Sequence, residues 1–269
     1  MIESVVMTTF FPNVAFDMLR SGRLALGFGI NQFRTPVAVH IAKSAGYQWL
    51  AIDMEHGGAT LQEVSQICLT ALPLGISPIV RIAAGAYDEG TRALDNGAQG
   101  LIVPHIETAE EAAYVVERFR YSPLGRRGWG GGAPQFGYAP PALDEAQKQL
   151  NDGSLLVLLI ESEQSVDEIE NLAGVDGIDA LMIGASDLSI AFGVPGTVGH
   201  PSMKDAFQRV SAACRAHGKI FGMGGVYDEF WARSYIEMGA RLVAGGADQG
   251  FLHAAARARA KFLMSLNSQ

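Results

Sequence analysis

Trp49-Leu-Ala-Ile-Asp-Met-Glu-His-Gly-Gly58 shows most clearly how this chain folds and where its chemistry lies. An apolar run opens the stretch and ends in Asp53, Glu55 and His56, and two glycines then let the backbone turn away freely. The pattern predicts a buried strand that delivers two carboxylates and an imidazole to one end of the fold. Three later apolar runs also end in charged residues, at Arg81, Glu161 and Asp187.

One unit of helix, glycine and strand recurs along the chain, beginning with a short helix at Phe16–Gly22. The predicted strands are continuous apolar runs, which are typical of a parallel sheet covered on both faces. They are Leu24–Gly29, Trp49–Met54, Pro78–Arg81, Gly100–Val103, Leu155–Ile160, Ala180–Ile183, Lys219–Gly222 and Leu242–Ala244. Eight such units predict a (β/α)8 TIM barrel, with an open doubly wound sheet as the main alternative.

Helix starts agree with this repeat. Thr60-Leu-Gln-Glu63, Thr108-Ala-Glu-Glu111 and Ser165-Val-Asp-Glu168 each fit the capping box that opens many helices. The apolar residues of Phe251–Met264 recur at helical spacing, so we expect a closing helix that packs on the barrel rather than a partner-binding tail. Because a barrel of this length is commonly one unit, we expect a single domain over residues 1–269.

Composition excludes several classes of partner. Hydrophobic residues make up 48% of the chain and charged residues 18%, which predicts a globular protein with a large core. A net charge of −8, without a lysine or arginine cluster, argues against nucleic acid. Cys68 and Cys214 both fall in amphipathic helical patterns and are expected in the core. With no leader pattern and no membrane-length apolar run, we expect no membrane contact and a cytoplasmic location.

The carboxyl ends of the strands open on one face of a barrel, where such enzymes carry their chemistry. His56, Arg81, His105, Glu161 and Asp187 should therefore meet there, although each alone has an ordinary structural explanation. Two carboxylates without a cysteine or an HExxH pair suit a hard divalent cation, Mg²⁺ or Mn²⁺. No lysine ends a predicted strand, so a metal-assisted enolate is favoured over an imine.

The sequence leaves open which of two roles Asp53 and Glu55 each play beside His56. One of them is expected to orient the imidazole and the other to pair with a nearby arginine, and we rank Asp53 first as the orienting group. Arg81 is placed to neutralise a developing oxyanion, and His56 to move protons directly or through water.

Motifs along nearly the whole chain then resemble one family. Ile52-Asp-Met-Glu-His56, Leu101-Ile-Val-Pro104, Arg120-Tyr-Ser-Pro-Leu-Gly-Arg-Arg-Gly128 and Ile183-Gly-Ala-Ser-Asp-Leu-Ser189 are similar to the HpcH/HpaI aldolase family. This group includes 4-hydroxy-2-oxoheptanedioate and 2-dehydro-3-deoxyglucarate aldolases. The resemblance implies a class II pyruvate aldolase on a (β/α)8 barrel, dependent on Mg²⁺, Mn²⁺ or Co²⁺ and assembled as a homohexamer.

The resemblance also implies residue roles. His56 is similar to the family's proton acceptor and Arg81 to its transition-state stabiliser, and Glu161 and Asp187 are similar to its metal ligands. Backbone amides of Ser186 and Asp187 would hold the pyruvate carboxylate. Asp95 resembles an acid that raises the histidine's basicity across a subunit boundary, with a polar helix end as its alternative reading.

Two features depart from this pattern or extend it. Leu159 stands where the family commonly has glutamine, two residues before the metal-binding glutamate. A polar contact to the substrate is therefore absent, and acceptance of a broader range of substrates is expected.

The Gly-rich excursion 126–137, before the fifth strand, follows a turn and therefore does not fit a nucleotide-binding loop. We expect it to be a lid or a subunit contact, with Arg127 near the substrate, rather than an ordinary surface loop.

The sequence therefore predicts an aldehyde-lyase that reversibly cleaves 4-hydroxy-2-oxo acids to pyruvate or a related 2-oxo acid plus an aldehyde. Its expected partners are these small molecules and further copies of itself. A 2-oxo acid decarboxylase or an enolate-based synthase on the same site is the alternative enzyme, and a catalytically dead binding barrel is the third reading.

Overall fold

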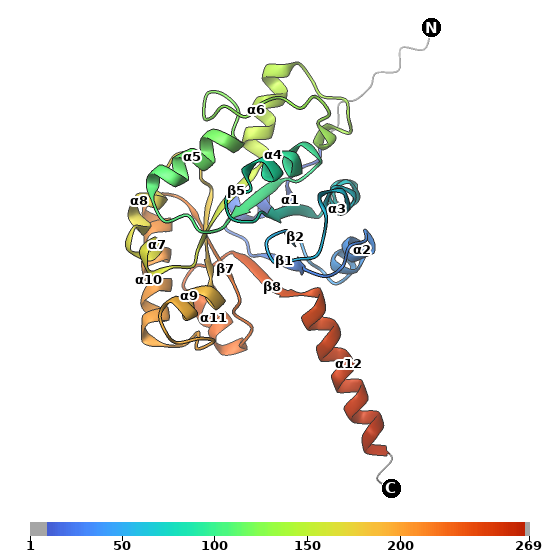
Figure 1. Ribbon diagram of the computed structural model, residues 1–269, viewed down its shortest axis with the longest axis vertical. Coiled ribbons are helices and arrows are strands. Elements are labelled where there is room, and N and C mark those ends of the chain that lie inside the picture. Colours follow the sequence, from blue (N-terminus) through green and yellow to red (C-terminus); the bar gives the residue numbers. More distant parts are fainter. Residues whose placement is uncertain (1–9, 267–269) are drawn as a thin grey trace.

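The computed structural model describes residues 10–266 and shows eight parallel strands that close into a barrel in sequence order (Figure 1). The strands are β1 Ala25–Ile30, β2 Trp49–Asp53, β3 Ser77–Arg81, β4 Gly100–Val103, β5 Leu155–Ile160, β6 Ala180–Gly184, β7 Ile220–Gly224 and β8 Leu242–Ala247. Closure occurs where β8 pairs with β1. The barrel prediction is confirmed, and the open doubly wound sheet is excluded.

Helices alternate with these strands, and the short helix predicted near the N-terminus precedes the first of them. The first six are α1 Val14–Arg20, α2 Val37–Ser44, α3 Leu61–Leu74, α4 Tyr87–Asp95, α5 Ala109–Phe119 and α6 Leu143–Gly153. The others are α7 Glu163–Asp167, α8 Ile169–Ala173, α9 Ala185–Ala191, α10 Pro201–Ala216, α11 Glu229–Glu237 and α12 Asp248–Ser265. A 3₁₀ turn, η1, spans Pro134–Phe136.

Two apolar layers hold the barrel together. One lies between the strands and the surrounding helices, and the other fills the interior. All six residues of β5 are buried, as its uninterrupted apolar run requires. Trp49 fills part of the interior opposite Gly27, where a Cβ atom would lie 2.2 Å from the indole ring. The stretch that opens at Trp49 therefore anchors the core before it delivers its charged residues to the barrel mouth.

The capping boxes are confirmed at two of the three predicted positions. Thr60 and Thr108 each accept a hydrogen bond from the backbone N–H three residues later, and each donates its own backbone N–H to the glutamate side chain at that position. The prediction at Ser165 is wrong, because Ser162 caps α7 one turn earlier, with Ser165 as its reciprocal partner. Cys68 and Cys214 are free, buried thiols, as expected, and burial raises the pKa of both.

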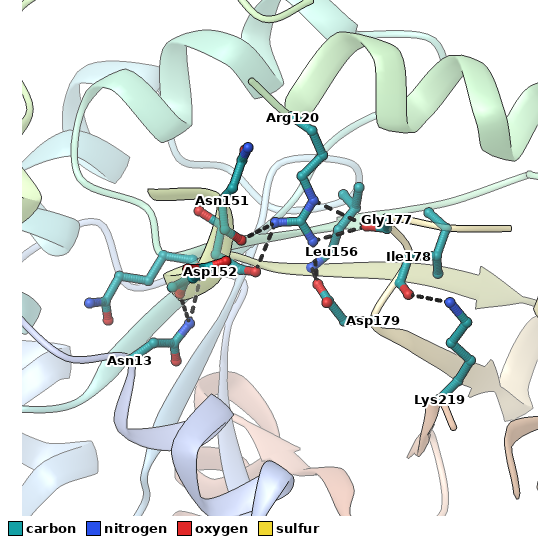
Figure 2. A network of polar contacts seen from close by, with 12 residues as sticks. Asn13, Arg120, Asn151, Asp152, Leu156, Gly177, Ile178, Asp179 and Lys219 are labelled. Atoms are coloured by element: carbon teal, nitrogen blue, oxygen red, sulfur yellow. Dashed lines mark hydrogen bonds and ion pairs between the residues drawn. The ribbon is translucent and has the colours of Figure 1, made fainter. Parts of the chain in front are cut away.

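Helix α1 and a polar network cover part of the N-terminal face of the barrel (Figure 2). Asn13 donates from Nδ2 to the carbonyls of Gln99 and Gly153 at 2.8 and 2.9 Å. Arg120 is buried there and binds the Asp179 carboxylate as well as three backbone carbonyls. These contacts fix the bottom of the barrel, whereas the opposite face stays open.

Helix α12 corrects the expectation of a closing helix. It projects away from the barrel (Figure 1), and only its first residue, Asp248, is buried. Phe251 still stacks on Phe28, with ring centroids 5.5 Å apart, but the following turns contact little of their own barrel. Within residues 10–266, no helix has both the length and the apolar character needed to cross a membrane.

Candidate active site

A cavity of about 370 Å³ opens at the carboxyl ends of the strands. Six of the residues predicted for the site line it: Asp53, His56, Arg81, Leu159, Ser186 and Asp187. Glu161 lies beside this wall, since a Cβ atom placed on Gly184 would be 3.3 Å from Glu161 Oε2. Residues more than 130 positions apart in the chain therefore meet at one mouth, as the repeat predicts.

Asp53 and Arg81 form the ion pair at the centre of this mouth. Arg81 Nε donates to Asp53 Oδ1 at 3.0 Å, and Nη2 donates to Oδ2 at 2.6 Å. Burial alone would raise the pKa of Asp53, but the bonds and charge of Arg81 outweigh it and hold that pKa below its usual value. Both groups are therefore charged at neutral pH, and the forked contact fixes the plane of the guanidinium.

Asn31 and Asp248 support this pair, and the sequence analysis missed both. Asn31 Nδ2 donates to Asp53 Oδ2 at 2.9 Å. Asp248 Oδ2 in turn accepts the backbone N–H groups of Asn31, Gln32 and Phe33 at 3.2, 2.9 and 2.6 Å. A continuous set of hydrogen bonds thus runs from the first residue of α12 to the arginine of the site.

Glu55, rather than Asp53, is the carboxylate nearest the His56 ring, which corrects our ranking of the two acids. Glu55 Oε2 lies 3.9 Å from His56 Nε2 and 3.3 Å from Arg81 Nη1. Asp53 Oδ1 instead accepts a hydrogen bond from the backbone N–H of His56 at 3.2 Å. The tight turn depends on Gly57, where a Cβ atom would lie 2.0 Å from the Asp53 carbonyl oxygen.

His105 and Glu161 form a wall beside the cavity and next to Glu55. The backbone N–H of His105 donates to Glu161 Oε1 at 3.0 Å, with His105 at a φ of 55°. Its ring spans two acids, 3.3 Å from Glu55 Oε1 and 3.3 Å from Glu161 Oε1. Burial raises the pKa of Glu161, and the charges of Glu55 and Asp187 raise it further, whereas the hydrogen bond and the charge of His105 lower it. This wall therefore concentrates negative charge that a cation would neutralise.

The donor set fits a hard divalent cation with open coordination positions. Within residues 10–266, no group of three or more His, Cys, Asp or Glu side chains is arranged as a complete metal site. Glu161 and Asp187 supply two carboxylates, and Mg²⁺ is commonly held by one or two, with water and substrate oxygens completing the shell. The protein provides no thiolate here, because both cysteines are in the core.

Comparison with known proteins assigns the chain to a family. The profile of the HpcH/HpaI aldolase/citrate lyase family matches residues 32–255. The chain belongs to this family. It is therefore an enzyme, an aldolase of the aldehyde-lyase class.

Two curated relatives and one solved structure support the assignment. The chain is 36% identical to a 4-hydroxy-4-methyl-2-oxoglutarate aldolase of Chaetomium globosum over 213 residues, covering 77% of this chain and 78% of that protein. It is 32% identical to a 2-keto-3-deoxy-L-rhamnonate aldolase of Escherichia coli over 245 residues, or 90% of each. The crystal structure of an HpcH/HpaI aldolase from Desulfitobacterium hafniense superposes with a TM-score of 0.87 at 28% identity, covering 92% of this chain and 95% of that one.

Two predicted site residues lie elsewhere in this aldolase chain. Asp95 is the last residue of α4, and Arg127 Nη2 donates to its Oδ1 at 2.6 Å. Both line a separate small cavity, formed with Gly130 of the Gly-rich excursion. The excursion does not line the cavity at the mouth within one chain, so its role as a lid or subunit contact, with Arg127 near the substrate, stays a prediction. Either residue can serve a mouth only in an assembly.

Proposed function

We propose that this aldolase reversibly cleaves 4-hydroxy-2-oxo acids to pyruvate, or a related 2-oxo acid, plus an aldehyde, with a divalent cation as cofactor. One observation carries the proposal. At a single barrel mouth an imidazole, a fixed guanidinium and two carboxylates surround a cavity of about 370 Å³, and none of the lysines within residues 10–266 lines that cavity. An imine route lacks its amine there, whereas an enolate route has a base in His56, a guanidinium in Arg81 and carboxylates that would hold a divalent cation.

The cation, Mg²⁺, Mn²⁺ or Co²⁺, would be held by Glu161 and Asp187. When bound, it supplies a positive charge that polarises the 2-oxo group and favours the enolate. The raised pKa of Glu161 supports this assignment. Burial and neighbouring acids disfavour the carboxylate form of Glu161, and a bound cation would stabilise that form.

The remaining steps belong to the chain's own groups. Free backbone N–H groups at the start of α9, at Ser186 and Asp187, would hold the substrate carboxylate. His56, directly or through a water, would remove the proton of the C4 hydroxyl, and the C3–C4 bond would then break to release the aldehyde. Arg81 faces the oxyanion that develops, and protonation of the enolate at C3 yields pyruvate.

Leu159 bears on the substrate range. Its side chain is buried in the cavity wall beside Gly184 and faces the interior with Met182. An apolar wall rejects alternative substrates less strongly than a wall that hydrogen-bonds one of them. We therefore propose a broad acceptance of 2-oxo acids, in which the aldehyde half contributes much of the remaining selectivity.

Pyruvate release from a panel of 4-hydroxy-2-oxo acids tests this function. After treatment with EDTA, release should stop and should return when Mg²⁺, Mn²⁺ or Co²⁺ is added. Glu161→Ala and His56→Ala should each abolish it, and Asp88→Ala, at an exposed surface ion pair, is the matched control. Decarboxylation of oxaloacetate without release from any panel member would instead support the decarboxylase or synthase alternative.

We also propose that the aldolase works as a homo-oligomer, with a hexamer as the expected form. Helix α12 leaves its own barrel, and its apolar residues face solvent: Leu252, Phe262, Leu263 and Met264. Val37 and Ile41, on α2 of the same chain, are exposed apolar side chains as well. Exposed apolar surface of this kind favours the exchange of α12 between two copies.

Such an assembly would also let Asp95 meet the mouth of another copy. Phe262→Asp should shift the protein to a smaller species in analytical ultracentrifugation, because it places a charge in the apolar contact. Leu124→Asp, at an exposed apolar loop residue outside α12, should leave the distribution unchanged. A monomeric wild-type protein with full activity would contradict the proposal.

A further inference from the structure

A second cavity lies at the N-terminal face of the barrel, opposite the mouth. It has a volume of about 580 Å³ and lies between α1, the ends of α10 and α11, and the starts of β6, β7 and β8. Four cationic side chains line it: Arg20, Arg215, Lys219 and Arg241. This local charge stands out in a chain whose net charge is −8.

The four cations of this cavity form no direct ion pair within residues 10–266, although Arg20 acts on the Asp179 carboxylate from a longer distance. Within residues 10–266, none of the four cations has a carboxylate oxygen within 4.0 Å. The acid in the lining, Asp179, is bound by Arg120 (Figure 2). Like charges gathered around one space repel each other unless an anion enters it.

Neutral carbonyl groups hold two of the cations in position. Lys219 Nζ donates to the carbonyls of Val175 and Ile178 at 2.9 and 2.8 Å (Figure 2 shows the second contact). Arg241 donates from Nη1 to Ile236 and Ala240 at 2.7 and 2.9 Å. These bonds fix the side chains without removing their charge, so little ordering is needed when a ligand binds.

The two other cations keep free donors. Among residues 10–266, the Arg215 side chain makes one hydrogen bond, from Nη2 to Ser211 Oγ at 3.3 Å. Arg20 uses Nη2 for the Asp152 carbonyl at 2.6 Å, and its guanidinium lies over the Phe16 ring. Their remaining N–H groups match the paired oxygens of a phosphate or a carboxylate.

We propose that this cavity binds an organic or inorganic polyanion through phosphate or carboxylate oxygens. The site is separate from the aldolase mouth and does not depend on the proposed function. The apolar part of its lining, which includes Leu19, Phe221 and Met238, gives room for a carbon body next to the anionic group.

Isothermal titration of metal-free protein, stripped on a chelating resin, tests the site at low ionic strength. Pyrophosphate is the phosphate probe and citrate the carboxylate probe. Saturable binding of at least one of them, weakened by added salt, is expected. Arg215→Ala should lower the affinity about tenfold or more, because it removes a charge-assisted contact, and Arg215→Lys should restore part of it.

Arg233→Ala is the matched control, because it removes an exposed arginine of α11 that lies outside the lining. It should bind like the wild type, and pyruvate release by Arg215→Ala in the absence of the anion should also be unchanged. The proposal is overturned if neither anion gives saturable binding, or if Arg215→Ala binds as tightly as Arg233→Ala.

Discussion

Asp53→Asn removes the negative charge from a carboxylate that accepts five hydrogen bonds in the site. The donors are two nitrogens of Arg81, Asn31 Nδ2, and the backbone N–H groups of Glu55 and His56. An amide keeps one acceptor oxygen and turns an NH₂ group toward some of these donors. Arg81 then keeps Glu55, at 3.3 Å, as its nearby carboxylate partner.

The magnitude follows from burial. Removing one partner of a buried ion pair costs about 3–5 kcal/mol. Arg81 is 21% exposed and retains Glu55, so we expect a lower loss, about 2–3 kcal/mol in the free energy of unfolding. For a chain of this length that corresponds to a fall of roughly 5–10 °C in Tm. Because the oxyanion contact loses its fixed geometry, kcat/KM should fall about 100-fold.

Thermal unfolding and pyruvate release measure both effects, with Asp88→Asn as the control. Asp88 pairs with Arg118 at 2.7 Å but is 92% exposed, so its replacement should move Tm by less than about 2 °C. The lowered pKa of Asp53 means that its charge stabilises the fold above its usual pKa of 3.8. This contribution is lost as pH falls below that usual value and through the lowered one, so the wild type and Asp53→Asn should converge in stability at acid pH. Equal Tm values for Asp53→Asn and Asp88→Asn at neutral pH would refute the reasoning.

Two further substitutions probe the same mouth. Asn31→Ala removes the 2.9 Å hydrogen bond to Asp53 and should lower kcat about tenfold with little change in KM. The control, Asn171→Ala, replaces an exposed asparagine and should leave kcat unchanged. Equal kinetics for the two variants would count against a positioning role for Asn31. Leu159→Gln places a hydrogen-bonding group in the cavity wall and should change relative kcat/KM values across the oxo-acid panel by about 10-fold or more. The apolar control, Leu159→Met, should leave these relative values unchanged. An unchanged ranking of the acids in Leu159→Gln would contradict the role given to this wall.

The strands were predictable because each is buried on both faces. The predicted bounds of Gly100–Val103 and Leu155–Ile160 match β4 and β5, and the other strands agree within a few residues. A parallel strand under helices must be apolar throughout, so its pattern is local and complete. The convergence of strand ends followed from the closed barrel alone.

The direction of α12 was not predictable from its own residues. Apolar side chains at helical spacing look the same whether they will pack on their own barrel or on another copy. What decides the outcome is the exit from β8, where Asp248 binds three backbone N–H groups after β1. Those groups lie more than 210 positions away in the chain, and no local pattern contains such a contact.

The roles of Asp53 and Glu55 could not be separated from sequence for a related reason. Asp53 ends β2 and Glu55 lies two residues later, so either could have faced the histidine. The backbone at Gly57 sets the turn, which directs Asp53 to Arg81 and leaves Glu55 near the His56 ring. Asn31 went unnoticed because its partner is on another strand, and an asparagine after a strand is common in turns.

The central claim, a cation-dependent enolate at this mouth, is tested most directly by proton exchange in pyruvate. In D₂O, reversible formation of the enolate replaces the methyl protons of pyruvate with deuterium, which ¹H NMR follows without any aldehyde. The account predicts exchange that requires enzyme and Mg²⁺ or Mn²⁺, stops with EDTA and is lost in Glu161→Ala. It also predicts that enzyme treated beforehand with pyruvate and borohydride, and then desalted, keeps its full exchange activity. Exchange that continues in EDTA and is blocked by borohydride would show an imine route and contradict the account.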